Sequence, residues 1–486
     1  MSQSIDSFAK HSLVYGLSNG INKLIPLVTL PVLSRSLSPK DYGIIAVLSL
    51  AAYAYSSVFG LGLGVSAGVV YFKSEDQRHR QLTIITSFFL LAISSIVLVM
   101  FCSALGPYIS MVAFRDGQFA SLILLHATGI ALQIMTQPFL WKLQFENQAL
   151  KYALLSAGGA AISMAAILIL TVWSERGVHG WVEGAVIGNS SLLFSILVWK
   201  VRYHRAVSIL HLAPELLKLG LPHVPAFAFV FLIQYSGIYM LEWYLPLDQV
   251  GIYGIGYSIG MALGLATTAF STAWYPFFQG YGKSQGEALV IFQKILVAYA
   301  LMFGSLCLLF FVFAEPVVSF LVDSRYQEAY LVIGPIALAQ FFLGMWVILL
   351  PGVYFAGETY YMPVIQGVIA GIVLTLNFLL IPKLGIQGAA ISFTIGALGM
   401  VCLQGVLNKF RRYLVVSYVW YRPGLFVGLL LLMGAGNVLA SSTLSSRGQL
   451  ITGVAMACAY FGIAWAVLST HERLQVLQWA KEKVLA

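Results

Sequence analysis

The sequence predicts an all-α membrane protein with about fourteen transmembrane helices, arranged as two parallel six-helix repeats and two further C-terminal helices. Three observations lead to this prediction. Apolar stretches of about 20 residues recur from His11 to Thr470. Lys and Arg collect in every second gap between these stretches, and two glycine-containing turns repeat at an offset of 208 residues.

The composition favours membrane helices over other folds. Charged residues make up 9% of the 486 residues and hydrophobic residues 59%, whereas soluble domains carry about 25% charged residues. Because a helix rises about 1.5 Å per residue, about 20 apolar residues cross a hydrocarbon core of about 30 Å. An outer-membrane barrel would alternate in segments of about 10 residues, but stretches such as 84–105 are apolar at consecutive positions.

Each predicted span is long enough to cross the bilayer as a helix that satisfies its own backbone hydrogen bonds. In chain order the spans are 11–33, 42–70, 83–106, 119–140, 152–173, 181–199, 222–244, 251–275, 289–313, 331–354, 361–381, 388–407, 424–442 and 450–469.

The distribution of basic residues predicts the orientation. If both termini lie on one side, that side holds nineteen Lys and Arg and the opposite side seven, with Lys23 inside the first span. The excess of basic residues marks the cytoplasmic face, so we expect both termini in the cytoplasm. The net charge of +9 then reflects topology and contact with anionic lipids, not nucleic-acid binding. No small-residue cleavage site follows the first span, so we expect no removable signal peptide.

Two turns indicate an internal duplication. Residues 37–44 align with 245–252, and residues 177–180 align with 385–388, both at an offset of 208. This offset covers six spans, an even number, so the repeats enter the membrane from the same side and are related by an axis along the membrane normal. The expected regions are a six-helix bundle at 1–200, a cytoplasmic linker at 201–221, a second bundle at 222–410, two more helices at 411–470 and a cytoplasmic tail at 471–486.

Several classes of function are disfavoured. The four cysteines lie in predicted spans without paired spacing, which argues against a disulfide framework and a metal site. No HExxH, Walker A or dinucleotide-binding glycine motif occurs, so we expect no cofactor and no ATP-driven transport by this chain alone. A membrane polymerase or acyltransferase would need a nucleophile, a base and a substrate domain, so we expect no enzyme. A passive channel explains the parallel duplication less well.

Several segments resemble a known family. The opening residues 8–16, the prolines Pro26 and Pro31, and the segment 30–43 closely resemble the start of the bacterial polysaccharide flippases. This family is the oligosaccharide-lipid branch of the superfamily that also contains the multidrug and toxic compound extruders. Residues 273–278 and 384–390 are similar to the same family.

The resemblance implies a flippase that moves a polyprenyl-diphosphate-linked oligosaccharide repeat unit from the cytoplasmic to the periplasmic leaflet by alternating access, for O-antigen, capsule or a related polysaccharide. It implies membrane lipid and, in the same pathway, polymerase and chain-length proteins as partners. An ion-coupled multidrug or cation extruder of the same superfamily is the alternative. By resemblance the last two spans form a groove for the polyprenyl tail, whereas their glycines equally permit close helix packing.

Polar residues inside spans are the candidate substrate site, because a sugar-diphosphate headgroup needs a polar path through the membrane. A lysine near the centre of a span costs about 2.5 to 3.5 kcal/mol on insertion and therefore faces the bundle interior or water. We expect Lys23, with Asn19 and Asn22 beside it, to contact the diphosphate. The alternative is a structural pair between Lys23 and Glu242 or Glu183.

Two more spans carry polar candidates for the substrate site. His126, Gln133 and Gln137 form a polar stripe on the fourth span, which lines water or makes interhelical hydrogen bonds. The seventh span, the repeat partner of the first, carries His223, Gln234 and Tyr235 as substrate candidates.

Three charged residues at span ends remain open between two roles. Glu242 on the seventh span and Glu183 on the sixth are ion-coupling carboxylates or end-of-helix charges. Arg35 at the periplasmic end of the first span receives phosphate late in transport or anchors the helix at the interface.

Overall fold

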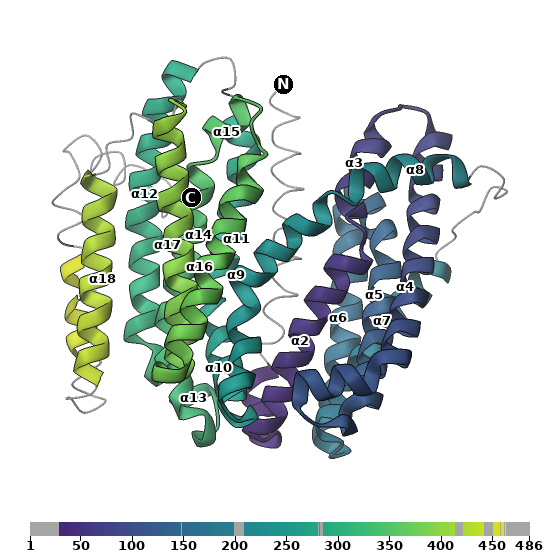
Figure 1. Ribbon diagram of the computed structural model, residues 1–486, viewed down its shortest axis with the longest axis horizontal. Coiled ribbons are helices and arrows are strands. Elements are labelled where there is room, and N and C mark those ends of the chain that lie inside the picture. Colours follow the sequence, from purple (N-terminus) through teal and green to yellow (C-terminus); the bar gives the residue numbers. More distant parts are fainter. Residues whose placement is uncertain are drawn as a thin grey trace. The chain divides into compact units, whose positions relative to one another are not determined.

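The computed structural model describes residues 29–146, 148–198, 209–279, 281, 285–413, 421–441, 451–456, 458–460 and 462. All regular secondary structure in these ranges is helical (Figure 1). The predicted all-α class is therefore confirmed.

The first part of the described chain holds the helices of the predicted first repeat and of the linker. Residues 29–36 are helical, and the following helices are α2 (Pro39–Phe59), α3 (Leu63–Phe72), α4 (Gln77–Phe114), α5 (Ala120–Phe145), α6 (Ala149–Leu168), α7 (Gly177–Val198) and α8 (Ile209–Gly220).

The second part holds the helices of the predicted second repeat and one helix beyond it. They are α9 (His223–Tyr244), α10 (Leu247–Gly260), α11 (Leu263–Gln279), α12 (Gln285–Val312), α13 (Ala314–Leu321), α14 (Tyr330–Ile348), α15 (Pro351–Phe355), α16 (Tyr361–Leu384), α17 (Ile386–Phe410) and α18 (Tyr421–Ser441).

The chain is a multi-pass membrane protein. Ten helical segments among the described residues are long and apolar enough to span a bilayer, and α10 with α11, bent by 42°, makes an eleventh. Two shorter apolar helices, Pro423–Gly434 and Ile451–Tyr460, lie where the last two spans are predicted. The predicted count of fourteen stays a prediction, since most of the first span lies outside the described residues.

Large apolar side chains are exposed along these helices, as expected of surfaces that face lipid. Met100 on α4 is 65% exposed and Phe194 on α7 is 68% exposed. In water such surfaces would mark association or aggregation, whereas in a bilayer they are solvated by acyl chains.

The described residues form two compact units, which are not the two predicted repeats. The first unit runs up to Ser258 and includes Leu321–Tyr326 and Gln366–Ser392, and the second unit contains Ile259–Phe320, Gln327–Ile365 and the described residues from Phe393 onward. In the first unit α4 packs on α5, α6 on α7, and α2 on α9. In the second unit α12 packs on α14 and α18, and α11 packs on α14. The first unit thus includes helices of both predicted repeats.

The first repeated turn forms a helix start. Ser38 is the N-cap of α2, and its hydroxyl accepts a hydrogen bond from the backbone N–H of Asp41 at 3.2 Å. The Asp41 carboxylate accepts in return from the backbone N–H of Ser38 at 2.9 Å. This capping box, with Pro39 at the first helical position, explains why a new helix begins at this point of the chain.

The second repeated turn has the same backbone conformation in both copies. Gly177 has a φ of 55° and Gly385 a φ of 56°, and these two residues are 208 positions apart. Glycine adopts this left-handed conformation without the steric cost that other residues pay. The turns that suggested the duplication are therefore structural equivalents.

Helices α2 and α10 make a reciprocal contact between the repeats, within the first unit. A Cβ on Gly43 would lie 2.1 Å from the carbonyl oxygen of Leu247, and a Cβ on Gly251 would lie 1.9 Å from the carbonyl oxygen of Pro39. Residues 39 and 247 are repeat equivalents, as are 43 and 251. Such mutual contacts are typical of a two-fold axis.

Ala46 and Gly254 lie where that axis passes between the two helices. They are repeat equivalents, and a Cβ on Gly254 would lie 3.1 Å from the Cβ of Ala46. Equivalent residues touch only close to a symmetry axis. The parallel arrangement predicted from the even number of spans agrees with this contact.

Loops assigned by the sequence to one face also contact each other. Lys73 pairs with Glu215 of α8 at 2.7 Å, and Arg411 pairs with Glu358, and all four residues lie on the predicted cytoplasmic side. The hydrogen bonds from Arg411, and then from Tyr413, hold the pKa of the Glu358 carboxyl below its usual value. These contacts agree with the predicted alternation of loops.

Candidate functional site

The second predicted span is broken between α2 and α3. Leu61 and Gly62 have positive φ values of 53° and 65°, a conformation that is uncommon outside glycine. A Cβ on Gly62 would lie 2.1 Å from the carbonyl oxygen of Gly220 at the end of α8. The glycine therefore lets α3 lie against α8, and the last turn of α2 ends beside an open space.

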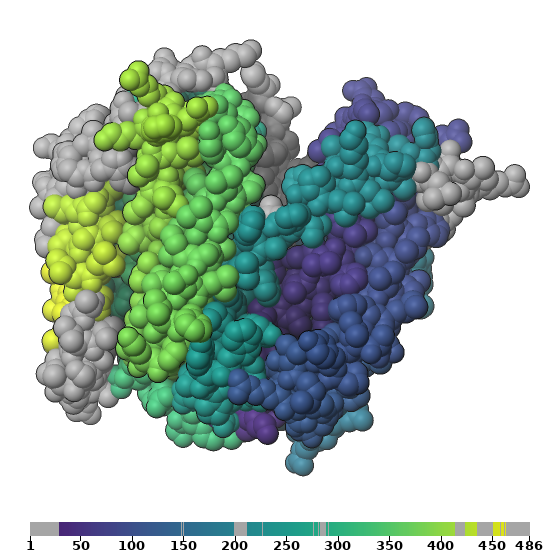
Figure 2. Space-filling view, viewed as in Figure 1, coloured from purple at the N-terminus to yellow at the C-terminus, as the bar shows by residue number. Residues whose placement is uncertain are grey.

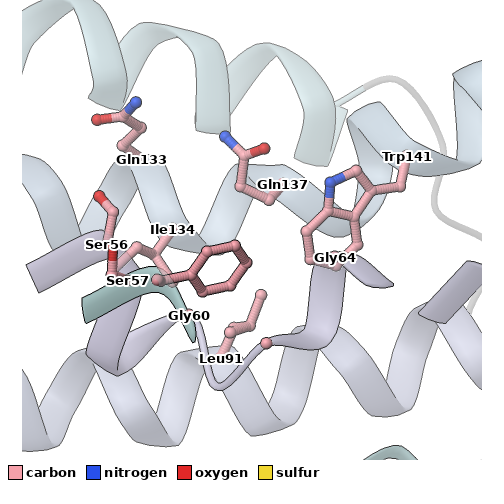
Figure 3. Close-up of a pocket in the computed structure, with 11 residues that line it drawn as sticks. Ser56, Ser57, Gly60, Gly64, Leu91, Gln133, Ile134, Gln137 and Trp141 are labelled. Atoms are coloured by element: carbon pink, nitrogen blue, oxygen red, sulfur yellow. The ribbon is translucent and has the colours of Figure 1, made fainter. Parts of the chain in front are cut away.

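A pocket of about 300 Å³, which we call the polar pocket, lies beside this break. Ser56 and Ser57 line it from α2, and Gln133, Gln137 and Trp141 line it from α5 (Figure 3). Figure 3 shows the two amides and the indole in a row along α5, with the Ser56 hydroxyl on the side of Gln133. The remaining lining residues are Gly60, Gly62, Gly64, Leu91, Ile134 and Phe227.

The spacing on α5 explains how one helix contributes three polar groups. Gln133, Gln137 and Trp141 recur every fourth residue, so they share one helix face. Gln133 is exposed and Gln137 is half-buried, although both lie inside a span. Polar side chains avoid lipid and face the bundle interior or a water-filled cavity, which is where the polar pocket places them.

The chemistry of the polar pocket suits a neutral polyhydroxylated group. Amides and hydroxyls both donate and accept hydrogen bonds, and an indole adds an apolar face with one N–H donor. No charged side chain occurs among the described residues that line this pocket. These described side chains therefore suit hydroxyl groups better than an ion.

His126, the third member of the predicted stripe, lies elsewhere. It is 4% exposed, and its Nε2 donates a hydrogen bond to the carbonyl oxygen of Leu48 at 2.9 Å. Its ring stacks on Trp181 with centroids 6.1 Å apart. The structure thus separates His126, which joins α5 to α2, from the two glutamines at the polar pocket.

The candidates on α9 are also separated. Tyr235 lies in a ring cluster, with its centroid 4.9 Å from that of Tyr53 on α2 and 6.0 Å from that of Tyr257 on α10. Gln234 is half-buried on the same helix. His223 is exposed at the start of α9, where its Nδ1 donates to the carbonyl oxygen of Leu219 at 3.0 Å.

The predicted diphosphate contacts Lys23, Asn19 and Asn22 lie outside the described residues. Both carboxylates proposed as alternative partners of Lys23 have an arginine nearby. Glu183 forms an ion pair with Arg176, and Glu242 is described below.

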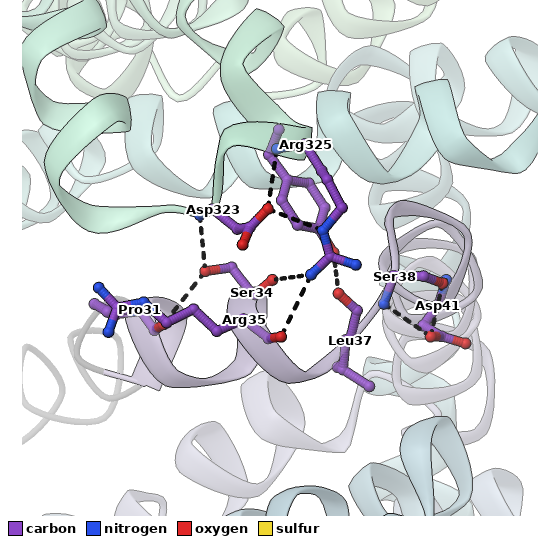
Figure 4. A network of polar contacts seen from close by, with 9 residues as sticks. Pro31, Ser34, Arg35, Leu37, Ser38, Asp41, Asp323 and Arg325 are labelled. Carbon is purple, nitrogen blue, oxygen red and sulfur yellow. Dashed lines mark hydrogen bonds and ion pairs between the residues drawn. The ribbon is translucent and has the colours of Figure 1, made fainter.

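Arg325 joins the loop before α14 to the end of the first span (Figure 4). Its Nη2 donates to the carbonyl oxygens of Ser34 at 3.2 Å and Arg35 at 3.3 Å. Its Nε donates to Asp323 at 2.9 Å, and the backbone N–H of Asp323 lies 3.4 Å from the Ser34 hydroxyl. We call this group the Arg325 contact. The side chain of Arg35 is exposed, so only its backbone takes part.

The Arg325 contact affects the ionisation of the Asp323 carboxyl. Hydrogen bonds from the backbone N–H and the guanidinium of Arg325 hold the pKa of the Asp323 carboxyl below its usual value. The carboxylate is therefore ionised, and the Arg325 contact intact, at neutral pH.

Arg115 of the first repeat makes the corresponding contact with the end of α9 in the second repeat. Its Nη2 donates to the carbonyl oxygen of Trp243 at 2.7 Å, and its Nε lies 3.8 Å from the Glu242 carboxylate. Glu242 is 5% exposed, and its second carboxylate oxygen has no hydrogen-bond partner among the described residues. We call this group the Arg115 contact.

The two arginine contacts occupy equivalent places in the repeats. Ser34 and Arg35 align at the 208-residue offset with Glu242 and Trp243. Each arginine comes from a loop of one repeat and binds the helix end of the other. Both contacts lie within the first unit and on the predicted periplasmic side.

Sequence reasoning missed four of these residues. Ser56 and Ser57 lie in a run that looks like one uninterrupted span, and only the Gly-Leu-Gly sequence at 60–62 hints at the break. Arg115 and Arg325 look like ordinary loop charges, because their partners are distant in the sequence. No group of three or more His, Cys, Asp or Glu suited to a metal occurs in the part of the chain that the structure describes.

Comparisons with known proteins agree on the fold. The family model described as "Polysaccharide biosynthesis protein" matches residues 8–281. A solved structure described as "Lipid II flippase MurJ, inward closed conformation" matches with a TM-score of 0.71 and 15% identity, covering 93% of this chain and 99% of that chain. A comparison with curated proteins found no match.

Transporters with other descriptions share the fold at similarly low identity. An inward-facing multidrug resistance MATE family transporter of the MOP superfamily has a TM-score of 0.61 and 14% identity, covering 82% of this chain and 94% of its own. A MOP superfamily transporter from Pyrococcus furiosus has a TM-score of 0.54 and 14% identity, covering 83% and 95%. These similarities bear on the fold alone.

Proposed function

The chain belongs to the polysaccharide biosynthesis protein family, and from this premise we propose that it is a flippase for a lipid-linked oligosaccharide. Its substrate is a polyprenyl-diphosphate-linked repeat unit, which it moves from the cytoplasmic to the periplasmic leaflet for O-antigen, capsule or a related polysaccharide. The lipid II flippase that shares its fold over 93% of the chain supports this class of substrate.

The polar pocket is the observation that carries the proposal. A glycan crosses a membrane only if hydroxyl partners replace its water, because unpaired polar groups cost several kcal/mol each in hydrocarbon. The pocket offers Gln133, Gln137, Ser56 and Ser57 within spans, and Trp141 as a flat apolar face. Because its described lining residues carry no charge, the pocket suits the glycan part of the substrate.

The diphosphate needs a cation, and none occurs among the described residues that line the polar pocket. We assign this role to Lys23, with Asn19 and Asn22 as hydrogen-bond donors to the phosphate oxygens. Arg35 is the candidate for a late phosphate contact, since its side chain is exposed and its helix end faces the predicted periplasm. Gln234 and Tyr235 on α9, and more remotely His126 and His223, complete the candidate set.

The proposed cycle is alternating access between the two repeats. In this structure the Arg325 and Arg115 contacts hold loops of one repeat on helix ends of the other, both on the predicted periplasmic side. That side opens only if these hydrogen bonds break. Glu242 and Glu183 are the candidate ion-coupling groups, and Glu242 has the stronger case because its protonation would weaken the Arg115 contact.

The remaining assignments belong to the same proposal. The protein lies in a bacterial inner membrane with both termini in the cytoplasm, and its repeats span 1–200 and 222–410 around the linker 201–221. The helices at 411–470 and the tail at 471–486 follow the repeats. Polymerase and chain-length proteins of the same pathway are its expected partners, and the chain itself catalyses no reaction.

An ion-coupled drug or cation extruder is the second candidate, because a multidrug transporter shares the fold with a TM-score of 0.61. Such a protein needs carboxylates exposed to its cavity. Glu183 and Glu242 instead lie beside Arg176 and Arg115, so this alternative has less support.

Deleting the gene and analysing the lipids tests the proposal. One lipid-linked oligosaccharide should accumulate on the cytoplasmic leaflet, and its composition would name the sugar. Complementation with Gln133→Ala/Gln137→Ala should fail to clear the lipid, since two lost hydrogen bonds of about 1 kcal/mol each weaken binding more than tenfold. The matched control is Gln81→Ala, an exposed glutamine on α4 outside the pocket. A deletion strain with no accumulated lipid but with drug sensitivity would favour the extruder.

A further inference from the structure

A second cavity, larger than the polar pocket, lies among α2, α4, α9 and α16. Its volume is about 830 Å³, within the range of small-molecule sites. The lining is aliphatic and aromatic, with Leu50 and Ala54 from α2, Phe101 and Val112 from α4, Leu232 from α9 and Phe378 from α16. No charged residue occurs among the described residues that line this cavity, which we call the apolar groove.

The serine and threonine hydroxyls in the apolar groove are already engaged. The Ser236 hydroxyl accepts a hydrogen bond from the Asn377 amide at 3.0 Å. The Thr375 hydroxyl donates to the backbone carbonyl of Gly371 at 2.9 Å. Apart from the tyrosine hydroxyls of Tyr55, Tyr108 and Tyr239, a ligand here therefore meets hydrocarbon and aromatic surface, which favours an apolar chain over a sugar or a phosphate.

The apolar groove is open along the membrane-spanning part of these helices. Phe378 is 61% exposed, Tyr108 is 70% exposed and Trp243 is 47% exposed, and all three line it. In Figure 2, α2 (purple) lies at the bottom of a hollow between α9 (teal) and α4 (blue). A chain can thus enter from the bilayer without crossing a polar surface.

The apolar groove and the polar pocket follow one another along the same two helices. On α2, Ala54 of the groove is three residues before Ser57 of the pocket, and on α9, Phe231 of the groove is four residues after Phe227 of the pocket. Residues three or four apart share a helix face. The rings of Tyr53 and Phe231, with centroids 5.8 Å apart, lie at the boundary.

This order of surfaces matches an amphiphile with a polar head and a long apolar chain. We propose that the apolar groove binds the polyprenyl chain of the lipid-linked substrate while the glycan occupies the polar pocket. The inference rests on the proposed function and adds to it a site for the tail on α2, α4, α9 and α16. It differs from the sequence-based expectation that the last two helices hold the tail.

Photocrosslinking of the full-length protein tests this site. Phe378 is replaced by p-benzoylphenylalanine, and the protein is illuminated in vesicles containing a polyprenyl phosphate and phosphatidylglycerol in equal amounts. The matched control is the same replacement of Phe194, which is 68% exposed on α7 and lies outside the groove. We expect adducts at position 378 to be enriched in polyprenyl phosphate about tenfold over those at position 194. Equal ratios at both positions, or phospholipid adducts alone, would overturn the inference.

Filling the apolar groove gives an independent test. Thr375→Phe places a ring in it, and displacing about two methylene groups of a bound chain should weaken polyprenyl phosphate binding about tenfold. Ser195→Phe is the control, because Ser195 is also exposed on a helix and bonds the carbonyl four residues earlier. Equal binding by both variants would reject the groove as the site of the tail.

These results separate two kinds of failure. Translocation of the oligosaccharide lipid without enrichment at position 378 would leave the flippase in place and move the tail elsewhere. Enrichment at position 378 without translocation would keep the site and reject the flippase.

Discussion

The Arg325 and Arg115 contacts are equivalent in position but not in chemistry. In the first repeat the helix end carries Ser34, whose hydroxyl and carbonyl are neutral, and in the second repeat the same place carries the carboxylate of Glu242. Both helix ends offer backbone carbonyls to an arginine of the other repeat. The duplication therefore explains where the loops bind, whereas the second repeat adds a buried charge that the first lacks.

Because of that difference, removing the arginine has a different energetic cost at each contact. A buried carboxylate that loses its cation remains desolvated and uncompensated. The neutral backbone carbonyls of Ser34 and Arg35, to which Arg325 donates, cost less when they lose this partner. The second repeat is thus the more sensitive to loss of its arginine, and the predictions below test this asymmetry against the symmetry of the backbone.

The largest effects should come from the glycines at the repeat axis, where the halves are alike. Gly43→Ala and Gly251→Ala each put a Cβ about 2 Å from a carbonyl oxygen. We expect each to lower the free energy of unfolding by about 1–3 kcal/mol or more. Thermal unfolding of the purified protein measures this.

Gly158→Ala and Gly371→Ala are the matched controls, because nothing lies within 4 Å of a Cβ at either position. Both should be neutral or slightly stabilising, since alanine favours a helix over glycine. An effect at only one of the two axial glycines would contradict their equivalence.

The next effect separates the two arginines. Arg115→Ala should lower the free energy of unfolding by about 2 kcal/mol and Arg325→Ala by about 1 kcal/mol, because only the first leaves a buried carboxylate without its cation. Both estimates allow for the exposure of the arginines. Equal losses of unfolding free energy, or a larger loss for Arg325→Ala, would show that the two contacts do not differ in this way.

Making the second repeat resemble the first should reduce that loss. Glu242→Ser puts at position 242 the residue found at Ser34, so Arg115→Ala should cost about 1 kcal/mol less in the Glu242→Ser background. A double-mutant cycle on unfolding free energies measures the coupling. Strict additivity would show that Arg115 and Glu242 do not interact.

The smallest effect concerns pH and the Arg325 contact. The pKa of Asp323 is lower in the folded protein than in the unfolded chain, because Arg325 hydrogen-bonds its carboxylate. Its stabilisation is therefore fully present above the unfolded pKa of about 3.9 and is lost as pH falls through the folded value. Asp323→Asn should lower stability slightly at neutral pH, where the carboxylate is ionised, and leave strongly acidic pH nearly unchanged, so that the acid limb of the stability curve becomes flatter. An unaltered acid limb would exclude this carboxyl as its source.

The sequence predicted what local patterns determine. Hydrophobic length located the spans, and the offset between Gly177 and Gly385 found the duplication, because a left-handed turn favours glycine at both places. Gln133 and Gln137 were predicted from their spacing to share a polar face, and both line one pocket in the structure.

Features that depend on tertiary contacts could not be predicted from the sequence. The break after α2 depends on how closely Gly62 approaches Gly220, which no local pattern reveals. His126 has the spacing of the glutamines, yet it bonds the carbonyl of Leu48 because α2 passes beside it. Arg115 and Arg325 bind backbone carbonyls, which carry no sequence signature.

The most direct test measures translocation by the purified protein in vesicles. A dye-labelled polyprenyl-diphosphate oligosaccharide is placed in both leaflets, and an impermeant reductant destroys only the dye outside. With the protein present, dye from the inner leaflet should also be lost, whereas a dye-labelled phospholipid should stay protected. If the oligosaccharide lipid stays protected while a labelled organic cation crosses, the protein is not the flippase described here.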